Sequence, residues 1–191
     1  MRTLLGCLLV ISAGAGFAND DAAEANRLNN LAFRYYAQRN YAEAAPLARR
    51  AMAIWEKLDP EGVNFALSLN NLAVVLEFTS QHKQTEPLLK RSLAMMESEL
   101  SGTDPRIASV LNNLAAFNQR KGKEAAARDY YLRSLEILQK AYGPEDGRVK
   151  AVLKALAAIG SRTPRAEIRI GGPDSTEMLR RPVESDRGTR R

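Results

Sequence analysis

A repeat with a period of about 42 residues constrains this chain more than any other feature. Related stretches recur at intervals of 41, 42 and 42 residues, headed by Leu28, Leu69, Leu111 and Leu153. In the first three units a small residue follows the heading leucine at a constant distance of 23 residues, and these residues are Ala51, Ser92 and Ser134. Constant spacing inside a unit, with variation only between units, predicts a rigid supersecondary element joined by tolerant loops.

Each unit is predicted to form two helices. In the first unit Leu28, Leu31, Ala32 and Tyr35 follow the i, i+3, i+4, i+7 spacing of one helix face. Turn-forming residues separate the units, in the stretches DPEG (59–62), SGTDP (101–105) and GPEDG (143–147). A single hairpin cannot cover its own apolar face, but stacked neighbours can. The pattern therefore predicts one continuous core built from three helical hairpins and a closing helix.

The stretch LAFRYYAQRNYAEAAPLARRAMAI resembles a tetratricopeptide repeat (TPR) of the 42-residue type, found in kinesin light chains and in many bacterial proteins. The similarity extends over about residues 24–157. It implies an all-α, right-handed α-solenoid in residues 19–160, with repeats at about 24–58, 64–100 and 106–142 and a capping helix at 146–159. The sequence departs from the family pattern at Arg39 and Ser80, which replace the glycine of the turn inside the first and second repeats.

Paired asparagines occupy one position of each repeat. In the family that the chain resembles, the first helices line a concave groove, and an asparagine of this motif hydrogen-bonds the backbone of an extended peptide. The match falls on Asn30, Asn71 and Asn113, with Asn29, Asn70 and Asn112 beside them. A carboxamide both donates and accepts, so it can pair with any peptide group. The alternative is that these side chains bond neighbouring repeats and hold the stack in register.

Further residues of the same helix face are expected to set side-chain preference in the groove. They are Phe33, Tyr36, Val74, Glu77, Phe78, Gln119 and Arg120. Phe33 and Phe78 would supply apolar contacts, and Arg120 would give the groove a positive end. A solvated turn is the alternative interpretation for Arg120, because Lys121 and Lys123 follow it.

The first eighteen residues, MRTLLGCLLVISAGAGFA, have the layout of a secretory signal peptide. Cleavage is expected between Ala18 and Asn19, with a second choice after Ala15. No apolar run approaches the roughly 20 residues that span a bilayer, so no transmembrane segment is expected in the mature chain. Anchoring as a lipoprotein through Cys7 is not favoured, because the apolar run continues past it. The mature chain would then lack cysteine, and the expected location is the bacterial periplasm.

The net charge of +6 is concentrated at the two ends of the chain. Residues 1–18 carry +1, residues 19–160 carry +2 and residues 161–191 carry +3. The balanced body argues against nucleic-acid binding, which needs a concentrated basic face. Residues 161–191 contain eight arginines, three prolines and three glycines, and are predicted to form a disordered basic tail.

No pattern in the sequence indicates catalysis. Phosphate-binding loops, nucleophile elbows and metal signatures are absent from the sequence, and the single histidine, His82, has no partner at ligand spacing. We therefore expect neither an enzyme nor a metal or other cofactor. The sequence favours an interaction scaffold or adaptor of the cell envelope that binds a peptide segment of a partner protein. The alternative is a self-associating assembly module, because solenoid ends expose apolar edges.

Overall fold

The computed structural model describes the backbone of residues 11–160 and the side chains of residues 19–160. The predicted tail, residues 161–191, and the first ten residues of the predicted leader lie outside the described residues. The described part is all-α, which confirms the predicted fold class. Its helices are α1 (Ile11–Ala37), α2 (Tyr41–Leu58), α3 (Val63–Leu76), the 3-10 turn η1 (His82–Gln84), α4 (Thr85–Glu99), α5 (Pro105–Arg120), α6 (Glu124–Tyr142) and α7 (Gly147–Gly160).

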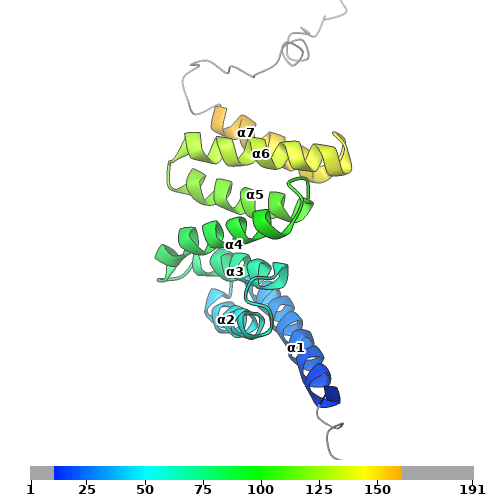
Figure 1. Ribbon diagram of the computed structural model, residues 1–191. Helices are drawn as coiled ribbons and strands as arrows, with labels where there is room; N and C mark the ends of the chain where they lie inside the picture. Colours follow the sequence, from blue (N-terminus) through cyan, green and yellow to red (C-terminus); the bar gives the residue numbers. More distant parts are fainter. Residues whose placement is uncertain (1–10, 161–191) are drawn as a thin grey trace, which may run out of the picture.

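The helices form a stack in chain order, with α1 and α7 at its opposite ends (Figure 1). The pairs are α1 with α2, α3 with α4, and α5 with α6, and each α-helix packs against the next along the chain. The first helices of the three pairs also touch one another, α1 against α3 and α3 against α5. These contacts place the repeated asparagine motifs side by side along one face of the stack.

The constant 23-residue spacing corresponds to the crossing of the two helices within each pair. The hydroxyl of Ser92 on α4 donates to the backbone oxygen of Ala66 on α3 at 2.6 Å. The hydroxyl of Ser134 on α6 donates to the oxygen of Ala108 on α5 at 3.2 Å. Ala51, the equivalent residue of α2, is fully buried. A larger side chain at these positions would push the helices apart, which explains why only small residues recur there.

The turns inside the first and third pairs adopt the same backbone conformation with different residues. Gly122 has φ 73°, and Arg39, at the equivalent turn of the first pair, has φ 60°. Glycine adopts this left-handed conformation without steric cost, whereas a residue with a Cβ does not. Asn40, directly after Arg39, caps α2, because its side chain accepts from the backbone nitrogen of Glu43 at 3.4 Å.

The buried side chains form three clusters, and the partly buried Leu88 of α4 packs against all three. Trp55 of α2 is buried against Phe65 and Leu69 of α3, so it joins the first pair to the second. At the other end, α7 closes the third pair with buried side chains on one face, namely Val149, Val152 and Ile159. The adjacent Leu153 remains 45% exposed on the outer face of α7.

Helix α1 is longer than its counterparts α3 and α5, and its backbone continues through the predicted cleavage point between Ala18 and Asn19. Within residues 11–160, no helix combines the length and the apolar character needed to cross a membrane.

Candidate functional site

A groove of about 400 Å³ lies along the first helices of the three pairs. It is lined by Asn29, Asn30, Ala32, Phe33 and Tyr36 from α1, Asn70, Asn71, Val74 and Val75 from α3, and Ser109 and Asn113 from α5. We call this the asparagine groove. Its lining contains amides, a hydroxyl, a phenol and apolar groups, and it contains no carboxylate, imidazole, thiol or cationic side chain. Such a surface is suited to hydrogen bonding with a peptide backbone and lacks an acid–base pair for catalysis.

The structure brings eight of the thirteen predicted site residues into the asparagine groove. These are Asn29, Asn30, Phe33, Tyr36, Asn70, Asn71, Val74 and Asn113. Three further lining residues, Ala32, Val75 and Ser109, had not been predicted as site residues. Ser109 lies one helical turn before Asn113, so extending the predicted face by one turn toward the start of α5 would have found it.

Several of the asparagines bond neighbouring repeats. The side-chain nitrogen of Asn113 on α5 donates to the side-chain oxygen of Asn70 on α3 at 2.8 Å. The side-chain nitrogen of Asn29 on α1 donates to the hydroxyl of Ser68 on α3 at 3.1 Å. Asn70 in turn is close enough to donate to Asn71, at 3.4 Å. Asparagine side chains thus bond α1 to α3 and α5 to α3, as the alternative interpretation of the motif predicted.

Asn30 and Asn71 differ from Asn29, Asn70 and Asn113 because both are exposed, although the Asn71 oxygen accepts from Asn70. Asn113 is only partly exposed, and its amide nitrogen is already engaged with Asn70. The second asparagine of the motif therefore has two roles: it faces the open groove in the first two repeats and bonds the preceding repeat in the third. In Asn29 and Asn112 the side-chain oxygens are buried and have no hydrogen-bond partner among the described residues.

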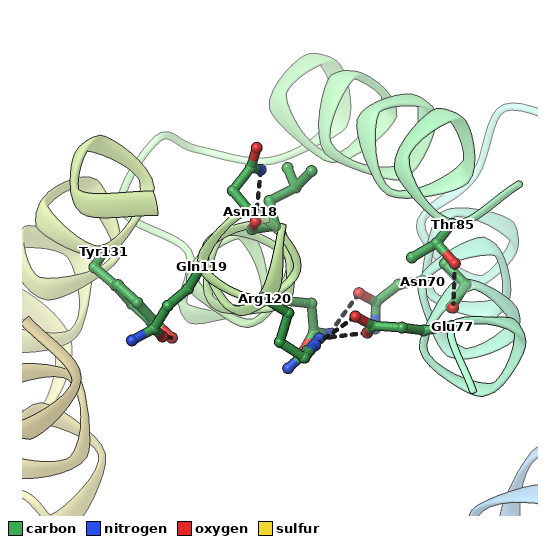
Figure 2. A network of polar contacts seen from close by, with 10 residues as sticks. Asn70, Glu77, Thr85, Asn118, Gln119, Arg120 and Tyr131 are labelled. Atoms are coloured by element: carbon green, nitrogen blue, oxygen red, sulfur yellow. Dashed lines mark hydrogen bonds and ion pairs between the residues drawn. The ribbon is translucent and has the colours of Figure 1, made fainter. Parts of the chain in front are cut away.

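Arg120 does not give the groove a free positive end. Its guanidinium forms a bidentate ion pair with the carboxylate of Glu77, in which Nε lies 2.5 Å from Oε1. The same guanidinium lies 5.7 Å from the centre of the Phe78 ring. Figure 2 shows Arg120 reaching from α5 to Glu77 at the end of α3. The Glu77 side chain is only 11% exposed, so the pair is partly shielded from water. The expectation of a positive end is therefore wrong. Arg120 and Glu77 form an ion pair without net charge that joins the third repeat to the second.

Four aromatic rings gather where α1 turns into α2. Tyr36 lies between Phe33, at 6.4 Å between ring centres, and Tyr41 and Phe78, at 5.7 and 6.0 Å. Tyr41 and Phe78 are stacked at 4.8 Å. Burial, with a contribution from Tyr41, raises the pKa of the Tyr36 phenol, so it remains a neutral hydrogen-bonding group. Phe33 is 68% exposed and is the ring most accessible to a ligand.

The remaining predicted residues lie outside the groove lining. Gln119 accepts from the hydroxyl of Tyr131 at 3.4 Å, within the third pair, as Figure 2 shows. Asn112 is half-buried, and Phe78 lies on Tyr41 beside a different cavity. His82 approaches the backbone oxygen of Thr79 at 3.4 Å. The described residues contain no group of three or more histidine, cysteine, aspartate or glutamate residues that could hold a metal ion.

Comparison with known proteins supports the repeat fold. A family model described as tetratricopeptide repeat matches residues 21–98 and 106–163, more than half of the chain. The kinesin light chain nearly identical TPR-like repeats of Podosopora anserina superimpose with a TM-score of 0.67 at 23% identity, over 73% of this chain and 66% of that chain. BtubC (BKLC) from P. vanneervenii superimposes with a TM-score of 0.62 at 19% identity, over 76% of this chain and 64% of that chain.

This chain therefore matches slightly less than two thirds of the length of those solved chains. At these identities the structural likeness establishes the fold alone. No curated protein sequence matches the chain.

Proposed function

Because the chain belongs to the tetratricopeptide repeat family, we propose that it is a non-catalytic interaction scaffold that binds an extended peptide segment of a partner protein in the asparagine groove. Repeats of this family generally mediate protein–protein interaction or scaffolding. The observation that carries the groove proposal is the position of two exposed carboxamides, Asn30 and Asn71, beside exposed Phe33 in one cavity.

The linked and the exposed asparagines have different parts in this proposal. Asn29, Asn70 and Asn113 hold successive first helices in register, because their amides bond across α1, α3 and α5. Asn30 and Asn71 are left to exchange hydrogen bonds with the backbone of a bound peptide. Phe33 and Val74 would select an apolar side chain beside that backbone. A binding surface arranged in this way would be rigid before the ligand arrives, which limits the entropy lost on binding.

Replacing the exposed amides tests the proposal. We expect Asn30→Ala and Asn71→Ala each to weaken partner binding about fivefold, because one hydrogen bond contributes on the order of 1 kcal/mol. The affinity of the double variant for the partner should be about twenty-five-fold lower if the two free-energy effects add. The readout is capture of the partner by a photo-crosslinker placed at Val74, followed by titration of the purified pair.

The matched control is Leu132→Ala on α6, an exposed apolar residue outside the groove lining. This variant should keep full affinity. If the Asn30→Ala/Asn71→Ala protein stays folded and binds the captured partner as tightly as the unmodified protein, the groove is not the binding site.

Self-association is the second candidate, and the exposed Leu153 on the outer face of α7 favours it. A contact through this face would be lost in Leu153→Asp. Sedimentation over a hundredfold range of concentration distinguishes the two candidates. A protein that remains monomeric throughout removes the assembly function and leaves the groove proposal intact.

We also propose that the scaffold acts after export, in the cell envelope. The support is the charged, apolar and small-residue pattern of residues 1–18. Cleavage would leave α1 beginning at Asn19. Mass spectrometry of the protein purified from its native cells should find that residue at the N-terminus, and an intact Met1 would contradict the proposal.

A further inference from the structure

A second cavity, of about 620 Å³, lies beside the turns of the first two pairs. It is lined by the start of α2 and by the segment that follows α3. Its residues are Arg39, Asn40, Tyr41, Ala42, Ala45, Pro46, Arg49, Phe78, Thr79, Ser80 and Gln81. We call this the lateral cleft. It shares no lining residue with the asparagine groove, although Tyr36 of the groove contacts Tyr41 and Phe78 of the cleft.

The lateral cleft carries positive charge that is not neutralised within the described part of the chain. Arg39 and Arg49 both line it, no carboxylate does, and neither arginine forms an ion pair with a described residue. The guanidinium of Arg49 donates instead to the side-chain oxygens of Gln81 and, at 3.4 Å, Gln84. Neutral amides orient a guanidinium without cancelling its charge, so the remaining donors can still bind an anion.

An apolar surface adjoins these charges. The stacked rings of Tyr41 and Phe78 lie at the cleft, and Ala42, Ala45 and Pro46 continue the surface along α2. Phe78 remains 43% exposed although the Arg120 guanidinium lies 5.7 Å from the centre of its ring. The cleft therefore combines two arginines with an apolar surface, which complements a ligand that carries a carboxylate next to an apolar side chain.

The backbone at Arg39 supports a role for this residue in binding. Arg39 is the one non-glycine residue with positive φ in residues 11–160, and the equivalent turn of the third pair has Gly122. An arginine in this conformation lowers stability relative to glycine. Backbone outliers of this kind tend to occur where a side chain is needed for function.

We propose that the lateral cleft binds an acidic and apolar segment of a partner protein, with its carboxylates on Arg39 and Arg49 and its apolar side chains on Tyr41 and Phe78. This site is additional to the asparagine groove. It would give the scaffold a second point of attachment at the turns of the first two repeats.

The test uses the full chain and a fluorescein-labelled octapeptide that alternates leucine and glutamate, with fluorescence anisotropy as the readout. The reference probe has glutamine in place of glutamate. We expect the glutamate peptide to bind at least tenfold more tightly than the glutamine peptide. Raising the salt from 50 to 300 mM should narrow that difference, because screening weakens charge pairing.

Arg39→Gly is the decisive variant, because it should weaken binding of the glutamate peptide about tenfold while raising the melting temperature of the protein. Loss of binding therefore cannot be attributed to unfolding. Arg49→Gln should weaken binding to a similar degree. Lys83→Gln, which removes a charge from the neighbouring turn outside the cleft lining, should leave the affinity within twofold.

Two results would overturn the proposal. One is equal binding of the glutamate and glutamine peptides. The other is that the Asn30→Ala/Asn71→Ala variant no longer binds the glutamate peptide while Arg39→Gly binds it fully. That result would place the peptide in the asparagine groove. If the asparagine double variant still binds the glutamate peptide, this supports the lateral cleft as the binding site of that peptide. The groove proposal is then tested by the partner-capture experiment alone.

Discussion

At the scale of single residues, the turns inside the first and third pairs show a local rule and its exception. Both turns require a residue with positive φ, and the third pair meets this need with Gly122. The first pair uses Arg39, and α2 then begins at Tyr41 with Asn40 as its cap. The sequence difference was visible in advance. The strained backbone and the cleft that surrounds the side chain could be seen only in the structure.

Exchanging the two residues measures the cost of this exception. We expect Arg39→Gly to raise the free energy of unfolding by about 1 kcal/mol, because the steric penalty of the left-handed conformation is removed. The reciprocal Gly122→Arg should lower it by a similar amount. A Cβ at Gly122 would meet no atom within 4 Å, so only the backbone penalty is introduced. Urea unfolding of both variants gives the values, and equal stability of all three proteins would contradict the strain argument.

At the scale of elements, two kinds of polar contact hold the helices in place. Hydroxyl groups bond backbone oxygens where the helices of a pair cross, at Ser92 and Ser134. Asparagine side chains bond across the first helices of successive pairs, Asn29 to Ser68 and Asn113 to Asn70. The close crossing at these serines was predictable, because small residues recur at constant spacing, but their hydrogen bonds were not. The second kind depends on how the pairs are stacked, so the sequence left two interpretations open.

Helix ends also depend on specific side chains, and α5 offers a pH-dependent test. Asp104 caps α5 by accepting from the backbone nitrogen of Arg106 at 2.8 Å. Hydrogen bonds from the side chain and then the backbone of Arg106 hold the pKa of the Asp104 carboxyl below its usual value. Because the folded pKa is lower than the unfolded value of about 3.9, this stabilisation is present above about pH 4 and is lost as the pH falls through the folded pKa.

We therefore expect Asp104→Ala to lower the free energy of unfolding by about 1 kcal/mol at pH 7. The difference from the unmodified protein should shrink as the pH falls from 4 to 2. Asp104→Asn is the matched control, since it keeps a capping oxygen and does not titrate. Urea unfolding at pH 7, 4 and 2.5 measures the effect, and a difference that stays constant over this range would exclude the carboxylate as its source.

At the scale of the whole molecule, α7 determines whether the stack ends in a covered core. Val149, Val152 and Ile159 are buried against the third pair, and α6 contributes Ile137 and Leu138 to the same core cluster. Solenoid proteins need such terminal helices, because the last repeat would otherwise expose the face that a further repeat covers. The outer face of α7, which carries Leu153, is exposed in the described structure.

Two neighbouring positions on α7 separate its buried and exposed faces. We expect Val152→Asp to lower the free energy of unfolding by roughly 3 kcal/mol, because an unpaired carboxylate would replace a buried apolar side chain. Leu153→Asp, with the same change one residue away, should alter it by about 0.5 kcal/mol or less. Thermal and urea unfolding compare the variants, and similar losses at both positions would contradict the assigned face of α7.

The repeat, the pairing of helices and the all-α fold were determined by the sequence itself, because the spacing of apolar and small residues sets which face of each helix is buried. Only the tertiary structure decided the roles of individual polar side chains. Stacking places Asn113 beside Asn70 and Arg120 beside Glu77, residues 43 positions apart in the sequence. It also assembles the lateral cleft from residues 39–49 and 78–81. These contacts depend on the register between neighbouring pairs, which arises from the packing of the whole stack and is not encoded in the period of any one helix.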